Sequence, residues 1–388
     1  MRKLWPFAFY FLLFAGIASV GPFLVLYYQG LGFSGTQIGL LTGITPLITF
    51  FGAPLWTGLA DASRRHRPMM SLAMSVGVIT LFVFPLLHAF VPVLLIAALL
   101  SFFTAPVTPF ADSATMFMLG DEKEMYARIR LGGTIGFGLA APVAGVLVQD
   151  YGLPSAFWVS AILFFLGFIV SQKLVYGQLT ADGPAKGRVR TLLANPRWLL
   201  FLIVALAGGA ASAVSNNFFF PYMKELGAKE STMGLALTVG TLGEIPVLFF
   251  GNRLIRRFKS YGLLMLSMVV TGLRLLLFAA CETPDLVLFI QLLNGLTFST
   301  MWVAGVSYAD ENAPAGMSAT AQGLFSAMVL GFGAAVGGFI GGPLLESMGG
   351  RGLYLVFGIA VLAVVVIVAL IYRRLPAGQK TLPAVVVH

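Results

Sequence analysis

Charged side chains are scarce in this sequence, and their scarcity excludes a water-soluble fold. Only 10% of the 388 residues are charged and 58% are hydrophobic, whereas about 25% of the residues in an average soluble domain are charged. So few charges cannot cover a soluble protein of this size. The formal net charge of +9 comes from short basic clusters between apolar runs. This pattern is typical of topology signals, and we therefore expect no nucleic-acid partner.

Metal-ligating, phosphate-binding and catalytic patterns are also missing. The single cysteine, Cys281, excludes a disulfide within the chain and a cysteine-rich metal site. His66 and His88 lie in predicted loops and His388 is terminal, so we expect no metal site. No glycine-rich loop followed by Lys-Ser or Lys-Thr occurs, which argues against an ATP-driven pump. No nucleophile-base set appears either, so we expect neither a cofactor nor an enzyme.

Long apolar runs recur along the chain, each about as long as a helix that crosses a bilayer. A transmembrane β-barrel would instead show alternating segments of about ten residues. The runs predict twelve spans. The first six are 4–28, 36–60, 68–88, 91–119, 125–149 and 154–176, and the second six are 196–223, 231–257, 260–281, 284–309, 316–343 and 350–373.

Lys and Arg residues are distributed unevenly between the two sides of this topology. Nineteen of the 24 fall on the side of both termini, and three, Lys224, Lys229 and Arg351, fall on the opposite side. Because cytoplasmic loops carry the excess of Lys and Arg, both termini are predicted to be cytoplasmic. We expect a multi-pass monomer of the cell (inner or plasma) membrane, with the lipid bilayer as its surroundings.

Two stretches of the first half recur in the second half, both at one constant offset, which we call the repeat offset. The first matches Tyr27, Leu31, Gly32, Gly39 and Leu40 to Tyr222, Leu226, Gly227, Gly234 and Leu235, and the second matches Gly136-Phe137-Gly138 to Gly331-Phe332-Gly333. Parallel repeats around a shared cavity are one architecture of membrane transporters. The sequence thus predicts a six-helix bundle over 1–176, a basic cytoplasmic linker over 177–195, a second six-helix bundle over 196–375 and a C-terminal tail over 376–388.

Four ionisable residues fall inside predicted spans, namely Asp112, Arg130, Glu244 and Arg274. At membrane depth a charge is costly unless it is paired or hydrated, so each is a candidate functional residue. In one interpretation the two acids and two bases, two from each half, neutralise one another across a shared cavity and fix the helix register. In the other, Asp112 and Arg130 bind the substrate, because an arginine fork and a carboxylate suit a hydroxylated or carboxylated solute.

Two amides add to the predicted binding site. Asn216 and Asn217 lie in an apolar span, where their side chains need polar partners. Pro106 and Pro109 come just before Asp112 and predict a bent helix, and broken helices often line transporter cavities.

The segment Pro54-Leu-Trp-Thr-Gly-Leu-Ala-Asp61, followed by three arginines, resembles the signature loop between spans 2 and 3 of the major facilitator superfamily. The usual glycine four residues before the aspartate is Thr57 here. The resemblance implies an all-α membrane protein with twelve transmembrane helices, in two six-helix bundles related by pseudo-two-fold symmetry. It also implies that Asp61, with Arg64 and Arg65, forms a cytoplasmic gate.

Within that superfamily the chain is similar to the lactose permease branch, which includes relatives for nucleosides and phenylpropionate. The segment from Tyr126 to Phe137, YARIRLGGTIGF, looks like the start of span 5 in that branch. The resemblance puts Arg130 in the place of a sugar-binding arginine and Asp112 in that of its acidic partner. It puts Thr134 beside the solute and Phe137 where a tryptophan stacks on the sugar ring.

The proton-coupling residues of that branch are matched only in part. Arg274 matches an arginine of the coupling network, but Gln291, Asn294 and Thr297 stand where the branch has Lys, His and Glu in span 10. The glutamate of span 8 falls on Thr241, with Glu244 one turn further on. If protons couple transport, Asp112 and Glu244 are the acids that remain at membrane depth.

Three functions are compatible with these features. The first is a secondary active transporter of a small polar organic solute, a sugar, nucleoside or aromatic acid, that works by alternating access with proton symport. The second is a proton-antiport exporter of amphipathic compounds, because Gly138-Leu-Ala-Ala-Pro-Val-Ala-Gly145 partly resembles the Gly-Pro motif of such exporters. The third is a receptor or lipid scramblase on a transporter fold.

Overall fold

The computed structural model describes residues 4–120, 122–177, 192–314 and 317–375, and within these ranges the chain is helical without β-strands. The helices of the first half are α1 (Leu4–Val20), α2 (Leu24–Gly30), α3 (Gly35–Ser63), α4 (His66–Val83), α5 (Phe90–Thr104), α6 (Val107–Leu119), α7 (Tyr126–Tyr151) and α8 (Pro154–Ser171), with 3-10 turns η1 (Gly21–Phe23), η2 (Phe84–Leu86) and η3 (Lys123–Met125). Those of the second half are α10 (Pro196–Asn217), α11 (Phe219–Glu225), α12 (Glu230–Phe258), α13 (Ser260–Ala280), α14 (Pro284–Gln291), α15 (Thr300–Glu311), α16 (Ser318–Ser326) and α17 (Ala334–Arg374), with π-helical turns η4 (Gly295–Ser299) and η5 (Ala327–Gly333).

Twelve membrane crossings follow from these helices, as the apolar runs predict. Within the described ranges, eleven continuous segments are long and apolar enough to cross a bilayer. The last, Thr320–Arg374, has 55 residues, more than twice the roughly 20 that one crossing needs. Gly349 interrupts it with φ 67° and ψ −179°, a conformation that is essentially restricted to glycine. The segment therefore holds two crossings, which brings the total to twelve.

Several predicted spans are interrupted helices rather than continuous ones. Span 1 passes from α1 through η1, which contains Pro22, into α2. Span 4 breaks between α5 and α6 beside Pro106, because proline lacks a backbone N–H and clashes with the preceding turn. Spans 10 and 11 contain the π-helical turns η4 and η5, which occur frequently at functional sites. The predicted linker and tail fall almost wholly outside the described residues.

The helices of the two halves repeat with the spacing that the sequence match predicts. The 29 residues of α3 correspond, at the repeat offset, to the 29 residues of α12, and the helices α2 and α11, of seven residues each, correspond in the same way. The two non-glycine residues with positive φ in the described ranges, Arg64 and Lys259, are related by the repeat offset, as are Gly32 and Gly227. The halves are thus two copies of one six-helix plan, and the predicted all-α fold is confirmed.

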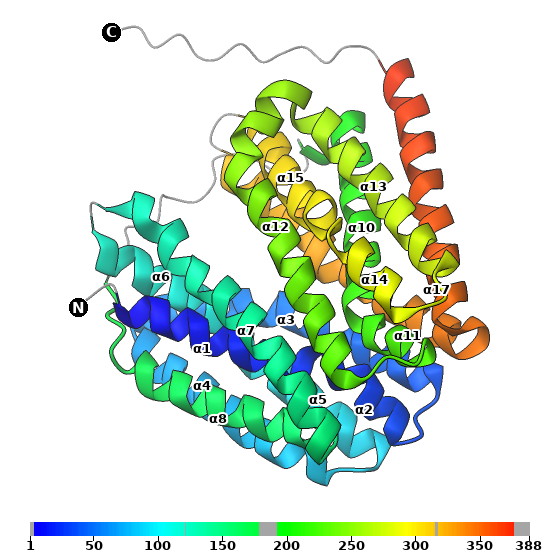
Figure 1. Cartoon of the computed structure of the whole chain (residues 1–388). Helices are drawn as coiled ribbons and strands as arrows, with labels where there is room; N and C mark the ends of the chain where they lie inside the picture. The colour runs from blue at the N-terminus through cyan, green and yellow to red at the C-terminus, as the bar shows by residue number, and fades with distance from the viewer. Residues whose placement is uncertain (1–3, 121, 178–191, 315–316, 376–388) are drawn as a thin grey trace, which may run out of the picture.

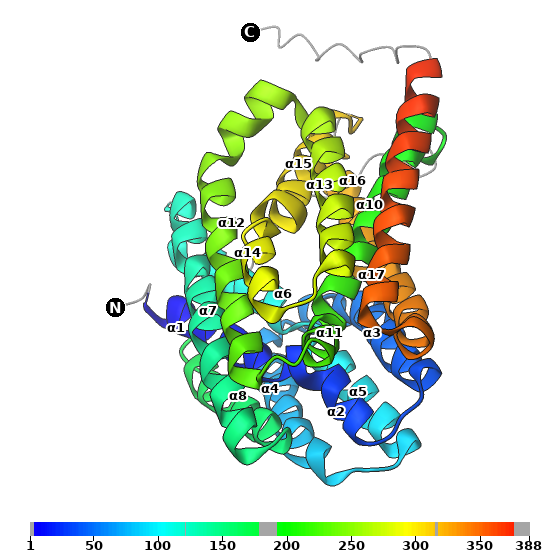
Figure 2. The same cartoon turned by 45° about the vertical axis from the view of Figure 1, so that its right-hand side comes forward.

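The two bundles meet at one end of the molecule and diverge at the other. Figure 1 shows the first bundle, coloured blue to blue-green, below the second bundle, coloured green to red. The two ends of the described chain, in α1 and α17, lie at diverging ends of the bundles (Figures 1 and 2). We call this end of the molecule the termini side, and the end where the bundles meet the closed side.

Glycines make the close contact between the bundles possible on the closed side. A Cβ atom on Gly342 of α17 would lie 2.3 Å from the Gly35 carbonyl oxygen of α3. One on Gly234 of α12 would lie 2.4 Å from the Ala141 carbonyl oxygen of α7. Side chains at these glycines would collide with backbone, so only glycine allows α3 to pack on α17 and α7 on α12 this closely. Two glycine-lined seams therefore join the bundles.

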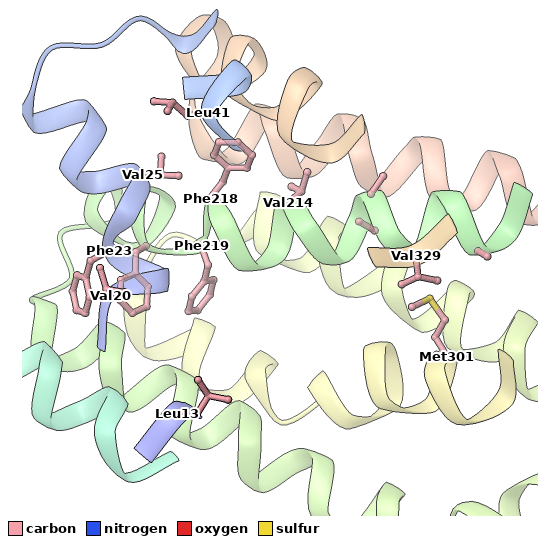
Figure 3. Close-up of a cluster of buried hydrophobic side chains, with 14 of the residues drawn as sticks. Leu13, Val20, Phe23, Val25, Leu41, Val214, Phe218, Phe219, Met301 and Val329 are labelled. Atoms are coloured by element: carbon pink, nitrogen blue, oxygen red, sulfur yellow. The ribbon is translucent and has the colours of Figure 1, made fainter. Parts of the chain in front are cut away.

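An apolar aromatic cluster fills the junction beneath these seams, where crossings 1 and 7 are interrupted. The rings of Phe23 in η1 and Phe220 in α11 meet edge to face, 4.7 Å apart between their centroids. Phe218 and Phe219 lie beside them and are almost completely buried (Figure 3). At membrane depth such rings stabilise the junction through van der Waals packing, because lipid is as apolar as the side chains. The cluster thus adds apolar contacts between the two bundles.

Candidate functional site

A cavity of about 580 Å³ lies between the two bundles, within the range of about 300–1,000 Å³ typical of sites for small molecules. It is lined by Phe14, Ile17, Gly21, Pro22, Leu24, Arg130, Gly133, Thr134, Phe137, Asn216, Asn217, Leu237, Thr241, Glu244, Asn294 and Phe298. Five of the six predicted binding residues, Arg130, Thr134, Phe137, Asn216 and Asn217, are in this wall. The structure thus brings together residues of α7 and α10, which belong to different bundles and lie far apart in the chain.

The sixth predicted binding residue, Asp112 of α6, pairs with Arg130 at the cavity wall. Nη1 of Arg130 donates hydrogen bonds to both carboxylate oxygens of Asp112, at 3.0 and 3.1 Å. The break of crossing 4 beside Pro106 starts α6 shortly before Asp112. Both side chains are partly exposed, and Arg130 lines the cavity.

Two tyrosines that the sequence analysis did not identify complete this pair. The Tyr10 hydroxyl, from α1, donates to Oδ1 of Asp112 at 2.5 Å, and Nη1 of Arg130 donates to the Tyr126 hydroxyl at 2.8 Å. Tyr126 precedes Arg130 by one helical turn, a spacing that places two side chains together on one helix face, so the sequence contained a signal for it. Tyr10 comes from a helix 102 residues away in sequence, and only the fold shows its role.

Glu244 of α12 lines the cavity from the second bundle. Asn294 donates from Nδ2 to its carboxylate at 2.6 Å. The two helices approach closely because both carry glycine at the contact, where a Cβ on Gly295 would lie 2.0 Å from the Gly243 carbonyl oxygen. The π-helical turn η4 begins at Gly295, directly after Asn294. Among the described residues no cation lies within ion-pair distance of Glu244.

Arg274 of α13 is buried away from the cavity lining. Arg274 is 5% exposed, and its guanidinium donates to the side-chain amide oxygen Oε1 of Gln291 and to the Thr297 hydroxyl, the latter at 3.2 Å. The guanidinium also lies over the Phe278 ring. These four residues form no direct ion pair across the cavity in this conformation, and the interpretation in which they neutralise one another stays a prediction. Asp112 and Arg130 pair within the first bundle, and the described part of the second bundle has no pair of Glu244 with Arg274.

The predicted gate residues lie on the termini side. Oδ1 of Asp61 in α3 lies 2.8 Å from Nε2 of His66 in α4. Arg64 ends α3 with a φ of 56°, and both Arg64 and Arg65 are exposed. In the described ranges neither arginine forms an ion pair with Asp61. His66, which the sequence analysis assigned to a loop, is the partner that was missed.

The structure gives no sign of a metal centre in the part of the chain that it describes, where no group of three or more His, Cys, Asp or Glu residues is arranged to hold an ion. The cavity carries one arginine, one glutamate, three asparagines and two threonines among apolar and aromatic groups. Such a wall offers hydrogen bonds and ring stacking to a polar organic molecule.

Two parallel six-helix bundles around one central polar cavity define a multi-pass membrane transporter of the major facilitator type. The chain belongs to the MFS_1 like family, whose model matches residues 4–356.

Curated relatives are transporters over nearly the same length. The chain is 26% identical over 357 residues to the uncharacterized transporter YwbF of Bacillus subtilis (strain 168), covering 92% of this chain and 90% of that protein. It is 27% identical over 375 residues to the maltose permease of Geobacillus stearothermophilus, with 96% and 95% covered. Multidrug resistance protein MdtG of Rahnella sp. (strain Y9602) is 28% identical over 297 residues, with 71% and 70% covered.

Solved structures share the fold. The nucleoside transporter NupG superposes with a TM-score of 0.85 at 20% identity, covering 96% of this chain and 99% of that one. A bacterial homolog of the human lysosomal transporter Spinster, in an inward-facing and unoccupied conformation, gives a TM-score of 0.72 at 16% identity, with 96% and 95% covered. At these identities the likeness concerns the arrangement of helices.

Proposed function

We propose that this protein is a secondary active transporter that imports a small, hydroxylated organic solute with protons by alternating access. The observation that carries the proposal is the Asp112–Arg130 pair beside a cavity between two bundles that are joined on one side only. Transporters of this build expose a central site to either side of the membrane by rocking one bundle against the other. The open termini side and the closed side correspond to one of the two positions of that cycle.

Arg130 retains free donors for a solute. All its hydrogen bonds to described residues leave from Nη1, so its Nη2 and Nε groups are available to the cavity. A guanidinium presents such donors in a rigid fork, which suits two neighbouring oxygen atoms. Thr134, Asn216 and Asn217 supply further hydrogen bonds, and Phe137 supplies a ring face. These groups together fit a hydroxylated ring.

The charges of the wall favour an uncharged solute over an aromatic acid. Asp112 pairs directly with Arg130, whereas the Glu244 carboxylate accepts a hydrogen bond from the neutral Asn294 amide and has no cation within ion-pair distance among the described residues. A solute carboxylate in the same cavity would meet this negative charge in a site of low dielectric. The relatives named for their solutes, a maltose permease and a nucleoside transporter, handle hydroxylated molecules.

Glu244 is the proposed proton-binding group, with Asp112 as the second acid at membrane depth. Protonation would neutralise the Glu244 carboxylate at the cavity wall. Arg274 is then a positioning group, because Gln291 and Thr297 hold it next to the helices that carry Glu244 and Asn294.

Reconstituted protein tests the proposal. In proteoliposomes, uptake of a sugar or nucleoside found by thermal-shift screening is expected to respond to an imposed pH gradient and to acidify the lumen. Asp112→Asn and Arg130→Gln are expected to abolish uptake, whereas Asp150→Asn and Arg128→Gln, which change exposed residues near the two ends of α7, serve as matched controls. Uptake that is indifferent to the pH gradient would contradict proton coupling, and uptake unaffected by Asp112→Asn would contradict the site.

Proton-antiport export is the second candidate. The motif-like segment from Gly138 to Gly145 forms the seam of α7 with α12, since the Gly145 Cβ position lies 2.4 Å from the Glu230 carbonyl oxygen. One relative is named a multidrug resistance protein. Export predicts that expression confers resistance to several amphipathic compounds and that Gly145→Leu abolishes this resistance.

The proposed topology has two bundles and cytoplasmic termini. We assign bundles to 1–176 and 196–375, joined by a cytoplasmic linker over 177–195, with a cytoplasmic tail over 376–388. The protein is a monomer in the cell (inner or plasma) membrane with both termini in the cytoplasm, and it is not an enzyme. Reporter fusions at either terminus test the orientation.

A further inference from the structure

His66 holds the gate aspartate on its own bundle. Asp61 lies in the last turn of α3, and the chain turns at Arg64 so that His66, the first residue of α4, comes back against it. Nε2 of the imidazole and Oδ1 of the carboxylate are 2.8 Å apart. The side chain of Asp61 is 72% exposed and that of His66 is 19% exposed. The imidazole is therefore the fixed member of the pair and the carboxylate the mobile one.

Two aromatic side chains of the first bundle hold the imidazole in place. The Tyr176 ring, just beyond α8, stacks on it with 5.7 Å between centroids and an angle of 17°, and Phe110 of α6 meets it edge to face at 5.9 Å. The next residue, Arg67, donates to the Gln172 carbonyl at 2.9 Å. The position of His66 is thus set by α6 and by the end of α8, independently of the second bundle.

The charged and titratable groups around the imidazole act in opposite directions. Asp61 of α3 favours the protonated form, and the exposed Arg64 and Arg65 of the turn and Arg67 of α4 oppose it. Burial raises the pKa of Tyr176, so this phenol is neutral at the pH of a cell. Asp61 is the group in hydrogen-bonded contact with the imidazole.

The second bundle offers Asp61 a competing set of partners on the termini side. Four exposed bases, Arg253, Arg256, Arg257 and Lys259, lie at the end of α12. Arg256 is related to Asp61 by the repeat offset and so occupies the same place in the structural repeat. Closure of the termini side would bring these bases towards the first bundle, where they would compete with His66 for the Asp61 carboxylate.

We propose that His66 is a pH-sensitive latch on this gate. Imidazole changes charge between about pH 5 and 8. In its protonated form it forms an ion pair with Asp61 and favours the conformation that is open on the termini side. As the pH rises, the imidazole loses its charge and releases Asp61. The population of the conformation that is closed on the termini side then increases. Because exposed pairs contribute little, the expected change in the ratio of closed to open protein is about two- to fivefold.

The latch adds feedback to the transport cycle. If the termini face the cytoplasm and protons enter with the solute, as in the proposed function, then cytoplasmic acidification protonates His66 and retains the carrier in its inward-open conformation. Import then slows when the cytoplasm is already acid. This consequence rests on the proposed function, whereas the latch itself does not.

Distances between spin labels across the gate test the latch without any solute. The only cysteine, Cys281, is buried, and Cys281→Ser gives a background for labels at Leu59→Cys and Phe258→Cys, both at exposed positions of α3 and α12. The full chain in nanodiscs is measured from pH 5.5 to pH 8.0. His66→Gln removes the titration and keeps a polar side chain, and His88→Gln, at an exposed position of the loop between α4 and α5, is the matched control.

The expected result is a rise of about two- to fivefold in the short-distance population with pH, retained in His88→Gln and absent in His66→Gln. Asp61→Asn, which has no charge to release, is also expected to be insensitive to pH. A pH response that persists in His66→Gln overturns the latch, and so does a distance distribution that is the same at every pH in the parent. Failure of solute uptake leaves these distances unaffected and so counts against the proposed function alone.

Discussion

The glycine seam between α3 and α17 allows a prediction about conformation that needs no knowledge of the solute. In Gly342→Ala, the new Cβ would lie 2.3 Å from the Gly35 carbonyl oxygen and 2.4 Å from the Gly39 nitrogen. Both neighbours are backbone atoms of a helix, and real Cβ atoms essentially never come within 3.0 Å of another group. The substitution therefore forces the two helices apart on the closed side.

The expected magnitude follows from the cost of overpacking. Inserting a methyl group into a well-packed contact costs about 1–3 kcal/mol, and this strain exists only while the seam is closed. The preference of a helix for alanine over glycine, about 1 kcal/mol, acts in both conformations and cancels. Since about 1.36 kcal/mol corresponds to a factor of ten, the ratio of protein with an open seam and a closed termini side to protein with a closed seam should rise by roughly 5- to 150-fold.

The assay uses the label pair at positions 59 and 258 across the termini side, at a fixed pH. Gly323→Ala, in α16 of the same crossing, is the matched control, because no atom lies within 4 Å of the Cβ position there. We expect the short-distance population to increase in Gly342→Ala and to stay at the parent level in Gly323→Ala. Identical distance distributions in the two variants would show that the seam does not set the conformation.

Three further predictions concern the polar residues. Tyr10→Phe removes the hydroxyl that donates to Asp112, and titration calorimetry should show solute affinity about tenfold lower, since a hydrogen bond to a charged group is worth about 1.5–3 kcal/mol. A double-mutant cycle of Asp112→Asn and Arg130→Gln should give a coupling of about 0.5–3 kcal/mol in solute binding, because the two side chains are in direct contact. Gln291→Leu leaves the buried Arg274 without its carbonyl acceptor and should lower the melting temperature in detergent by several degrees.

Matched variants separate these effects from general destabilisation. Tyr151→Phe changes an exposed tyrosine at the end of α7, and Gln29→Leu changes an exposed glutamine in α2. Both should behave like the parent. Equal solute affinities in Tyr10→Phe and Tyr151→Phe would remove Tyr10 from the site, and equal melting temperatures in the two glutamine variants would show that Arg274 does not depend on Gln291.

The sequence by itself determined the number of crossings, the repeat and several polar residues of the cavity wall. Apolar runs set the crossings because a lipid-exposed backbone has to satisfy its own hydrogen bonds, which leaves helices as the solution for continuous apolar segments. The constant offset between the matched stretches predicted the repeat that α3 and α12 show. Arg130, Thr134 and Phe137 share one helix face, and their membership of one wall follows from helical spacing.

Only the tertiary structure decided which charges pair. Asp112 and Arg130 belong to the consecutive helices α6 and α7 and meet, whereas Glu244 and Arg274 contact the neutral side chains of Asn294, Gln291 and Thr297 instead. Composition cannot distinguish these outcomes, because a pairing depends on the rotation of each helix about its axis and on how closely its neighbours approach. Glycines such as Gly243 and Gly295 determine how closely two helices approach. The partner of Asp61, His66, is the one available in the conformation in which the bundles meet on one side.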